Sequence, residues 1–404
     1  MLRFLTAGES HGKGLISIIE GIPANLEINS NYINYHLSRR QMGYGRGGRM
    51  KIEKDSADIF SGIRFGKTTG APISMLIKNN DWENWTEKMA VDFQIAEVEK
   101  ITIPRPGHAD LVGVSKYNLN DIRNSIERSS ARETASRVAV GSVARKFLEL
   151  FNIHVGSFVE SIGGVYSKDN FAQILFDNIQ PKNFNAWNLS KKADQSSVRV
   201  LETEHENKII AKIKTAKKKG DTLGGTFFVI ATGMPVGLGS FVQNDLRLDA
   251  DIASAMISIN AVKGVEIGSA FGNADKFGSL AHDEIIRNGK KIIRKTNRAG
   301  GIEGGISNGM PLIIRVAMKP IATLMSPIEA VDLSTMKSVI SRRERSDFVA
   351  VPACAVIAES MLSLVLSKFM LIKFGGDSVQ ETMDNFNSYN DKLFDRVKSN
   401  FRKS

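Results

Sequence analysis

Residues 128–151 read RSSARETASRVAVGSVARKFLELF, and this stretch predicts a long helix. Ser130 and Glu133 have the spacing of a capping box, in which a hydroxyl and a carboxylate satisfy backbone amides at a helix start. Small apolar residues recur along one face of the helix and form a narrow stripe: Ala131, Ala135, Ala139 and Val143. Because small side chains let helices pack closely, the stripe predicts a tight contact with a neighbouring element.

The segments around this helix mix helix and strand signals. Residues 251–262 (DIASAMISINAV) predict a second helix rich in small residues, and 352–371 (PACAVIAESMLSLVLSKFML) predict a buried third helix. Short strands bounded by glycine turns are predicted in five segments: 2–7, 50–63, 72–78, 224–234 and 311–319. A regular strand–helix–strand alternation would indicate a doubly wound parallel sheet, so its absence favours an α+β fold.

The chain is organised in one piece. Its 404 residues are 42% hydrophobic, which is enough for a large core, and they show no repeat of fixed period, long low-complexity tract or linker. We therefore expect a single domain over residues 1–378. Residues 379–404 are polar with sparse apolar positions, so we expect a peripheral tail that is either a loose helix or disordered.

Cysteine content and the N-terminus favour a cytoplasmic protein. Cys354 is the single cysteine, so an internal disulfide framework is excluded. Glu9 and His11 interrupt the first apolar run, so we expect no signal peptide. The most apolar stretch, 348–366, contains Pro352 and a glutamate, and we expect it to be a buried helix too short to span a bilayer.

Positive charge indicates an anionic ligand. The chain has 54 Lys plus Arg against 43 Asp plus Glu, a net charge of +11, which suits nucleic acid, an anionic membrane or a strongly anionic small molecule. The lysines are spread out, as on solvated faces. Many arginines lie instead among glycine and serine, in four segments: 38–51, 104–108, 126–133 and 342–347. Glycine frees backbone amides and arginine donates forked hydrogen bonds, so these segments favour close contact with an anion.

Two of the six histidines lie in short glycine-containing segments, GESHG (8–12) and RPGHADL (105–111). Glycine lets the backbone approach a ligand, and imidazole is a proton donor that titrates near neutrality, so His11 and His108 are candidates for acid–base catalysis. The alternative for GESHG is an ordinary polar turn. We expect the remaining histidines to be structural: His36, His154, His205 and His282.

Other motifs are less specific. The start of the helix near Ser130 offers backbone amides and a positive dipole end to a phosphate, in addition to simple capping. The segment NRAGGIEGGISNG (297–309) is expected to be a tight loop or a backbone cradle, but it lacks the GxGxxG spacing of a dinucleotide fold. No cluster has metal-ligand spacing, so we expect no metal site.

Ten segments, in order, resemble the signature blocks of the chorismate synthase family. They are GESHG (8–12), GRGGRMKIE (45–53), SGIRFGKTTGAPI (61–73), RPGHADLVGVSKY (105–117), ERSSARETASRVAVG (127–141), GDTLGG (220–225), MISINAVKGVEIG (256–268), NRAGGIEGGISNG (297–309), KPIAT (319–323) and RSDFVAVPA (345–353). The resemblance extends from about residue 4 to about residue 376, and ten ordered blocks are far more specific than any one of them.

The resemblance implies a fold, a reaction and a cofactor. The fold is a β–α–β sandwich with helices packed between two mainly antiparallel sheets, and the assembly is a homotetramer. The reaction is the last step of the shikimate pathway of aromatic amino acid biosynthesis, in which a carbon–oxygen lyase removes phosphate and a proton from 5-enolpyruvylshikimate 3-phosphate by 1,4-elimination to give chorismate. Reduced FMN is the transient electron donor. Two substrate carboxylates and two phosphates, one of them on the flavin, would explain a site rich in arginine.

The matched segments imply roles residue by residue. His11 protonates the leaving phosphate, His108 protonates the reduced flavin, and Asp347 lies near flavin N5 and helps to remove the substrate proton. Substrate contacts are implied for Ser10, Arg40, Arg46, Arg49, Arg105, Arg132 and Arg345. Flavin contacts are implied for Arg128, Ser129, Ser130, Asn260, Ala261, Gly304, Lys319, Pro320, Ile321, Ala322, Thr323 and Arg345. Arg40 and Arg46 also match NADP positions in members of the family that reduce their own flavin.

Two other classes of protein are alternatives. An unrelated flavin or nicotinamide oxidoreductase would use similar glycine-rich loops, but its turnover would change the redox state of the flavin. An RNA-binding module would explain the charge, yet aromatic residues make up 7% of the chain and do not alternate with the arginines, so a stacking platform is missing. No reductase domain is visible in the sequence, so we expect a separate flavin reductase to supply the reduced cofactor.

Overall fold

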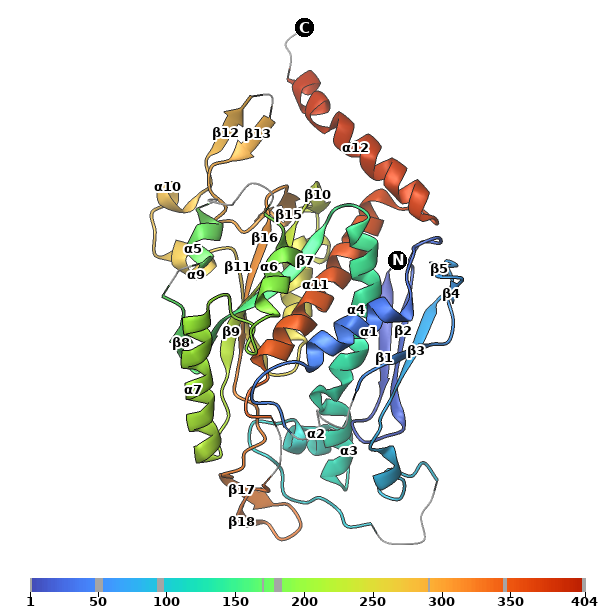
Figure 1. Ribbon diagram of the computed structural model, residues 1–404, viewed down its shortest axis with the longest axis vertical. Helices are drawn as coiled ribbons and strands as arrows, with labels where there is room; N and C mark the ends of the chain where they lie inside the picture. Colours follow the sequence, from blue (N-terminus) through green and yellow to red (C-terminus); the bar gives the residue numbers. More distant parts are fainter. Residues whose placement is uncertain are drawn as a thin grey trace.

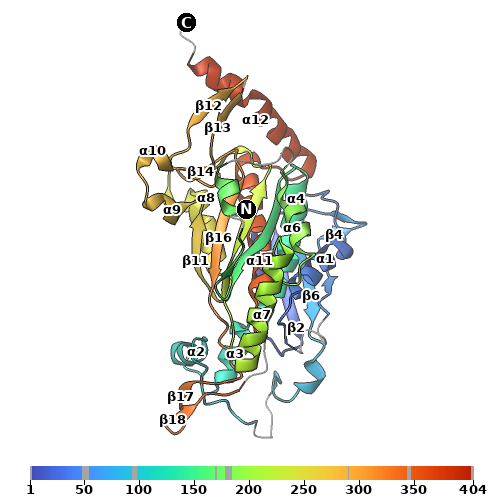
Figure 2. The ribbon, with the colours of Figure 1, turned by 60° about the vertical axis from the view of Figure 1, so that its left-hand side comes forward.

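Two long helices form the centre of the fold. The computed structural model describes residues 2–47, 54–92, 98–168, 171–177, 184–289, 291–343 and 347–401. Helices α4 (Thr134–Glu149) and α11 (Val351–Phe374) lie side by side between two sheets (Figures 1 and 2). Gly141 allows this approach, because a Cβ at that position would come within 2.8 Å of the Cα of Ser360. The predicted close packing of the first helix is therefore confirmed.

A four-stranded antiparallel sheet covers one side of the helices. Its strand order is β1 (Arg3–Gly8), β2 (Gly14–Glu20), β6 (Ile73–Lys78) and β3 (Ala57–Ile59). The register pairs Ile19 with Phe4 on β1 and with Ile73 on β6. Alternate residues of β2 point to opposite faces, so Leu15 and Ile19 are buried against the helices while Ile16 is exposed on the outer face.

A five-stranded antiparallel sheet covers the other side. Its strand order is β11 (Val262–Ile267), β16 (Leu312–Met318), β9 (Gly225–Thr232), β7 (His154–Ile162) and β8 (Val165–Tyr166). Both faces of β9 are buried, since Phe227 belongs to the main core and Phe228 packs in a smaller core with α6 (Ala186–Ala193). This explains why β9 is a continuous apolar run. The α+β prediction, a β–α–β sandwich with helices between two antiparallel sheets, is confirmed.

Shorter elements complete the fold. The remaining helices before α11 are α1 (Ser30–Gln41), α2 (Asp110–Tyr117), α3 (Ile122–Ser129), α5 (Phe171–Phe176), α7 (Thr203–Lys219), α8 (Leu248–Ile257), α9 (Ala270–Ala274), α10 (Gly278–Ala281) and the 3-10 helices η2 (Trp82–Asn84), η3 (Ala131–Glu133) and η4 (Asn244–Leu246). The remaining strands are β4 (Ile63–Arg64), β5 (Lys67–Thr68), β10 (Val236–Gly239), β12 (Ile285–Asn288), β13 (Lys291–Arg294), β14 (Ile302–Glu303), β15 (Ile306–Asn308), β17 (Glu329–Asp332) and β18 (Lys337–Ile340). The chain runs from α3 through η3 directly into the central helix α4. The C-terminal end of α3 therefore lies at the edge of the core.

The predicted elements are present, with shifted bounds. Helix α4 begins after η3 rather than at the predicted cap, and Ser130 caps η3 by accepting a hydrogen bond from the amide of Arg132 at 3.3 Å. Nearly every side chain of α4 is buried, not one stripe alone, because a sheet lies on each side of it. Residues 50–53 of the predicted strand 50–63 lie outside the described residues.

Helix α11 is a core helix despite its apolar composition. Within the described part of the chain it is the one helix long and apolar enough to cross a membrane, at 24 residues, but 83% of its most apolar window is buried inside the protein. Pro352 lies in its first turn, where a missing amide costs no helical hydrogen bond. The prediction of a buried helix is confirmed, but the prediction that it is too short to span a bilayer is wrong. Its burial, rather than its length, distinguishes it from a membrane span.

A buried ion cluster ties α11 to its neighbours. Glu359 accepts hydrogen bonds from Arg39 of α1 at 2.8 Å and from Arg199 at 3.1 Å, and it is ion-paired with Arg145 of α4. Burial alone would raise the pKa of Glu359, but the three guanidinium groups outweigh it and hold the pKa well below its ordinary range. Burial also lowers the pKa of nearby His36 well below its usual value, so this histidine is neutral.

The tail is the helix α12 (Val379–Asn400), and its first half packs against the end of α11. The hydroxyl of Thr382, which is fully buried, donates to a carbonyl at the end of α11 at 2.7 Å. The ring of Phe386 packs edge-on against Phe151 and Phe374, with centroids 5.0 and 5.2 Å apart. Of the two alternatives for the tail, the structure has the helix. That the tail is peripheral to catalysis stays a prediction.

Truncation tests this prediction. A chain ending at Asp391 keeps the Phe386 contacts and should unfold at the same temperature as the full chain. A chain ending at Ser378 loses them and should lose on the order of 2–4 kcal/mol of unfolding free energy. No residue of α12 lines the cavity described below, so both chains should retain most of the activity at a permissive temperature. Thermal unfolding and activity assays check this, and loss of activity in the longer chain would show that the tail has a catalytic role.

Candidate active site

One large cavity brings together segments that are far apart in the sequence. Its volume is about 760 Å³, within the range of ~300–1,000 Å³ found for small-molecule sites. Most of the predicted site residues line it: Ser10, His11, Arg40, Arg46, Arg105, His108, Ser129, Ser130, Arg132, Asn260, Ala261, Lys319, Ile321, Ala322, Thr323 and Asp347. Sequence positions from 10 to 347 thus converge on a single site.

The remaining predicted residues lie elsewhere. The guanidinium of Arg128 donates to the carbonyl oxygen of Thr6 at 2.9 Å and does not line the cavity. Pro320 lies between lining residues without lining it, and Gly304 lies in the turn between β14 and β15 and does not line it either. Arg49 and Arg345 lie outside the described residues.

His11 is held by Glu127 of α3 and by Trp85. Its Nδ1 lies 2.9 Å from Glu127 Oε1, and its backbone amide donates to Oε2 at 2.8 Å. The imidazole stacks on the indole ring of Trp85, with centroids 3.9 Å apart and planes 25° apart. A carboxylate only accepts hydrogen bonds, so the contact with Glu127 requires a proton on Nδ1.

His108 has a carboxylate at the same ring nitrogen. Asp110 Oδ1 lies 2.6 Å from its Nδ1, and Asp110 also accepts two hydrogen bonds from the guanidinium of Arg105, at 2.8 and 2.9 Å. Burial alone would raise the pKa of Asp110, but the hydrogen bonds from Arg105 and His108 outweigh it and hold the pKa well below its ordinary value. Asp110 is therefore ionised at neutral pH and fixes both partners.

Buried arginines form one wall of the cavity. Asp55 pairs with two of them, with Arg40 at 3.3 Å and with Arg132 more closely. Arg132 also donates to the side-chain carbonyl of Asn79 at 3.0 Å. Burial lowers the pKa of Arg40 to about 10, which still leaves it charged at neutral pH. These partners lie behind the wall and hold the guanidinium groups in place beside the cavity.

Asp347 lies at the end of the cavity near Arg46. The two side chains pair at 3.3 Å, and the amide of Gly47 donates to Asp347 at 2.6 Å. Among the described lining residues Asp347 is the one carboxylate. The cationic lining residues are Arg40, Arg46, Arg105, Arg132, Lys263 and Lys319. The cavity therefore carries the excess of positive charge that an anionic ligand needs.

A second wall combines apolar side chains with an unsatisfied carbonyl. Isoleucine, alanine and methionine side chains line it, and the amide nitrogen of Asn260 donates to the backbone of Ser129 at 3.0 Å. Within the described residues, the buried Oδ1 of Asn260 has no hydrogen-bond partner. Ala261 has a φ of 65°, which L residues rarely adopt, and its carbonyl accepts from the amide of Lys319 at 2.9 Å. An unpartnered acceptor on an apolar wall suits a flat ligand that carries an N–H group.

Comparison with known proteins decides the family. A family model described as chorismate synthase matches residues 2–371. The chorismate synthases of Chlorobium phaeobacteroides and Aquifex aeolicus are each 53% identical to this chain, over 96% of it and over 98% and 97% of their own lengths. The chain belongs to the chorismate synthase family. A solved structure titled "Crystal Structure of Chorismate Synthase" is 44% identical, with a TM-score of 0.79 and 98% coverage of both chains.

The chorismate synthase blocks did not reveal all residues that shape this site. Glu127 and Trp85, which hold His11, and Asp55, which holds two arginines, were not predicted. Asp110 could have been inferred as a partner, because it follows His108 by two residues in RPGHADL. Glu127 is 116 residues from His11, and nothing in the local sequence signals that contact.

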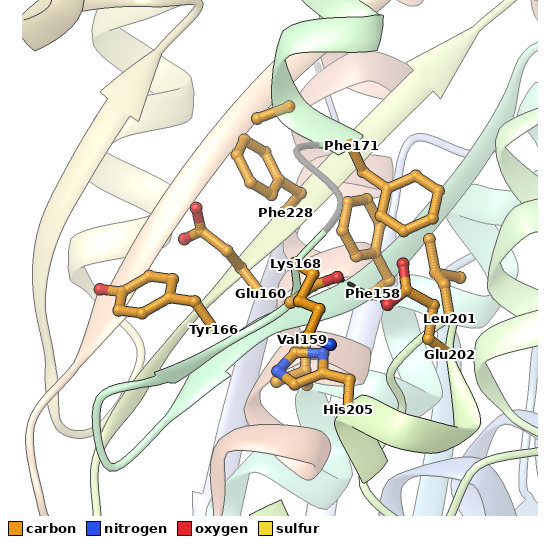
Figure 3. A pocket seen from close by; sticks show the side chains of 12 residues that line it. Phe158, Val159, Glu160, Tyr166, Lys168, Phe171, Leu201, Glu202, His205 and Phe228 are labelled. Carbon is orange, nitrogen blue, oxygen red and sulfur yellow. Dashed lines mark hydrogen bonds between the residues drawn. The ribbon is translucent and has the colours of Figure 1, made fainter. Parts of the chain in front are cut away.

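A smaller cavity lies outside the chorismate synthase blocks, between β7, β8 and the start of α7 (Figure 3). It measures about 350 Å³, and none of the predicted site residues lines it. One of its two carboxylates, Glu160, is paired with Arg315 at 2.7 Å. His205 contacts the carbonyl of Val165 at 3.1 Å, as expected for a structural histidine.

The other expectations concern metals and the remaining histidines. The described residues contain no group of three or more His, Cys, Asp or Glu side chains that could hold a metal ion. His36, His154, His205 and His282 do not line the large cavity. Cys354 does line it, but burial raises the pKa of its thiol to about 12, so it stays protonated at neutral pH.

Proposed function

We propose that this member of the chorismate synthase family, a carbon–oxygen lyase, converts 5-enolpyruvylshikimate 3-phosphate to chorismate in the shikimate pathway. The reaction is a 1,4-elimination of phosphate and a proton. The observation that supports it best is that His11 and His108, each with a carboxylate at Nδ1, line one cavity together with four arginines. This arrangement combines two proton donors with a strongly anion-binding surface.

The arginine wall would bind the substrate. Its two carboxylates and its phosphate are recognised by planar guanidinium groups, which donate two parallel hydrogen bonds to such anions. Arg40 and Arg132 are anchored by Asp55, and Arg105 by Asp110, so little side-chain entropy is lost when the anions bind. Ser10, which is buried beside His11, accepts a hydrogen bond from Ser130 at 3.1 Å and supplies a polar contact at the same end.

The two histidines and Asp347 would move the protons. His11 donates from Nε2 to the leaving phosphate as the C–O bond breaks. His108 keeps a proton available to the cofactor, and Asp347 assists in removing the proton of the substrate. The net reaction releases phosphate and one proton and changes no oxidation state.

The residues present fit a flavin. The unpartnered Oδ1 of Asn260 on an apolar wall is suited to an N–H group of a flat ring, and the same cavity is lined by Ser129, Ser130, Ala261 and the lining residues of 319–323. We propose that these residues hold reduced FMN. When bound, this cofactor would supply a transient electron to the allylic phosphate ester. Arg40 and Arg46 are proposed as NADP contacts if this chain reduces its own flavin.

The proposed reaction predicts a redox requirement without redox consumption. Purified protein, the enolpyruvyl phosphate substrate and chemically reduced FMN are mixed anaerobically, and chorismate and phosphate are measured. Product should form over many turnovers while the reduced flavin spectrum is unchanged at the end, because the electron is returned in each cycle. A control with oxidised FMN in air should give no product.

Two results would contradict the proposal. Equal activity with oxidised FMN in air would remove the role of the flavin. A stoichiometric change in flavin redox state would instead support an oxidoreductase.

The oligomeric state, the cellular location and the source of reduced flavin are also proposals. We propose a cytoplasmic homotetramer that depends on a separate flavin reductase. In support of an oligomer, the outer face of the four-stranded sheet exposes Leu5 and Ile16, at 72% and 48%.

A further inference from the structure

Glu127 joins helix α3 to the loop that carries His11. Its backbone carbonyl accepts from the amide of Ser10 at 3.0 Å, and its carboxylate accepts from the backbone amide of His11 at 2.8 Å. The same carboxylate lies 2.9 and 3.0 Å from Nδ1 of His11. The side chain of Glu127 is 2% exposed. A buried carboxylate is stable only when its oxygens are paired, so these contacts fix the loop and the ring together.

The face of the His11 ring is fixed as well. Trp85 stacks on it at 3.9 Å, and the indole nitrogen of Trp85 donates to Asp81 at 2.9 Å, which holds the indole in turn. The guanidinium of Arg123 lies 5.3 Å from the same indole ring and 3.9 Å from Glu127. One edge and one face of the imidazole are therefore held by neighbours, and both its position and its rotation are restricted.

We propose that Glu127 is a positioning residue that sets the tautomer of His11 and directs Nε2 to the ligand in the cavity. Resting on the proposed function, this inference makes Nε2 the atom that donates the proton to the leaving group. After the proton has left Nε2, the neutral ring keeps its other proton on Nδ1, and Nδ1–H donates a hydrogen bond to the carboxylate of Glu127. Nε2 can then be protonated again without a flip of the imidazole ring, because Nδ1 stays hydrogen-bonded to Glu127.

His108 supports the same reading of the geometry. It also has a buried carboxylate at Nδ1, Asp110 at 2.6 Å, although this carboxylate comes from its own loop. Two unrelated segments therefore present imidazoles to one cavity, each with a carboxylate at Nδ1. Nε2 of His108 lies 3.5 Å from the guanidinium of Arg105. In serine proteases a carboxylate at Nδ1 fixes the tautomer of the histidine, and its amide replacement leaves the wrong tautomer.

The matched variants are Glu127→Gln and Glu133→Gln. Glutamine keeps the shape of Glu127 but has one acceptor oxygen, which the backbone amide of His11 also needs, so an NH₂ group faces Nδ1. Glu133 is also a buried glutamate of this region, 6% exposed, but it pairs with Arg137 at 2.9 Å and does not line the cavity. It controls for the loss of a buried charge near α4.

The primary readout is the tautomer of His11, measured by NMR on ¹⁵N-histidine-labelled protein at a pH where the ring is neutral. The signal is assigned by its absence in His11→Ala. The wild-type chain and Glu133→Gln should show a proton on Nδ1, and Glu127→Gln should move it to Nε2. In the elimination assay, Glu127→Gln should lower kcat roughly 10- to 100-fold with little change in KM. Combined with His11→Ala, it should cause no further loss.

The two proposals fail separately. An Nε2–H tautomer of His11 in the wild-type chain would overturn the positioning role whatever reaction is catalysed. The same holds if Glu127→Gln keeps the Nδ1–H tautomer, or if the double variant is slower than His11→Ala alone. If the tautomer moves as expected but the wild-type chain forms no chorismate, the positioning role stands and the proposed function fails.

Discussion

His11→Ala should lower the turnover number by about 10²- to 10⁴-fold, which is the usual contribution of a general acid. Phosphate is a poor leaving group while fully charged, and in the proposed reaction His11, which contacts Glu127 and Trp85, supplies the proton. Single-turnover measurements under anaerobic conditions with reduced FMN report this step directly. The affinity for substrate should change far less, because the anchored Arg40, Arg105 and Arg132 would still bind its anionic groups.

Two other histidine variants serve as comparisons for His11→Ala. His108→Ala should alter the spectrum of the bound reduced flavin as well as the rate, since its proposed role is on the cofactor. His205→Gln, which changes a buried histidine beside the smaller cavity, should leave the rate nearly unchanged. If His11→Ala lowers the unfolding temperature but turns over normally, His11 is a structural residue of a polar turn and the catalytic role is wrong.

Apart from the residues implied by the family resemblance, the sequence predicted those parts of the site whose chemistry is local. GESHG and RPGHADL each combine histidine with glycine within a few residues, and the structure brings His11 and His108 to one cavity. Glu127 lies in the arginine-containing segment 126–133, but no local pattern there predicts its contact with His11. Its function depends on where α3 ends relative to residues 8–12, and that is set by tertiary packing rather than by any local pattern.

Some features of the fold also depend on tertiary packing that no local pattern predicts. The helix within 128–151 was predicted from a stripe of small residues, yet α4 is buried on almost every side. A helix between two sheets buries residues around its whole circumference, as Ala139, Gly141 and Arg145 are buried in α4, and a single apolar stripe does not predict this. Arg39, Arg199 and Glu359 were not recognised as a unit either, because Arg199 and Glu359 are separated by 160 residues and Arg39 and Glu359 by 320.

Glu359→Gln should lower the free energy of unfolding by about 3–5 kcal/mol, the cost of removing one partner from a buried ion cluster. The carboxylate is fully buried and joins Arg39, Arg145 and Arg199. Its loss leaves Arg39 and Arg199 paired with Asp194, and it removes the carboxylate partner of Arg145. Denaturant unfolding at neutral pH measures the difference from the wild-type chain. The control is Glu204→Gln, which removes an exposed carboxylate paired with Lys208 and should leave the stability nearly unchanged.

The pH dependence of this difference separates the charge of Glu359 from its packing. The folded pKa of Glu359 is depressed below the ordinary value of 4.5, so its contribution is present in full above that value and is lost as the pH falls toward the folded pKa. Glutamine has the same shape and does not titrate. The stability difference between wild type and Glu359→Gln should therefore be constant from neutral pH to about pH 5 and shrink below it. A difference that stays constant through this acid range would mean that shape and hydrogen bonding, rather than the ionised carboxylate, hold α11 to its neighbours.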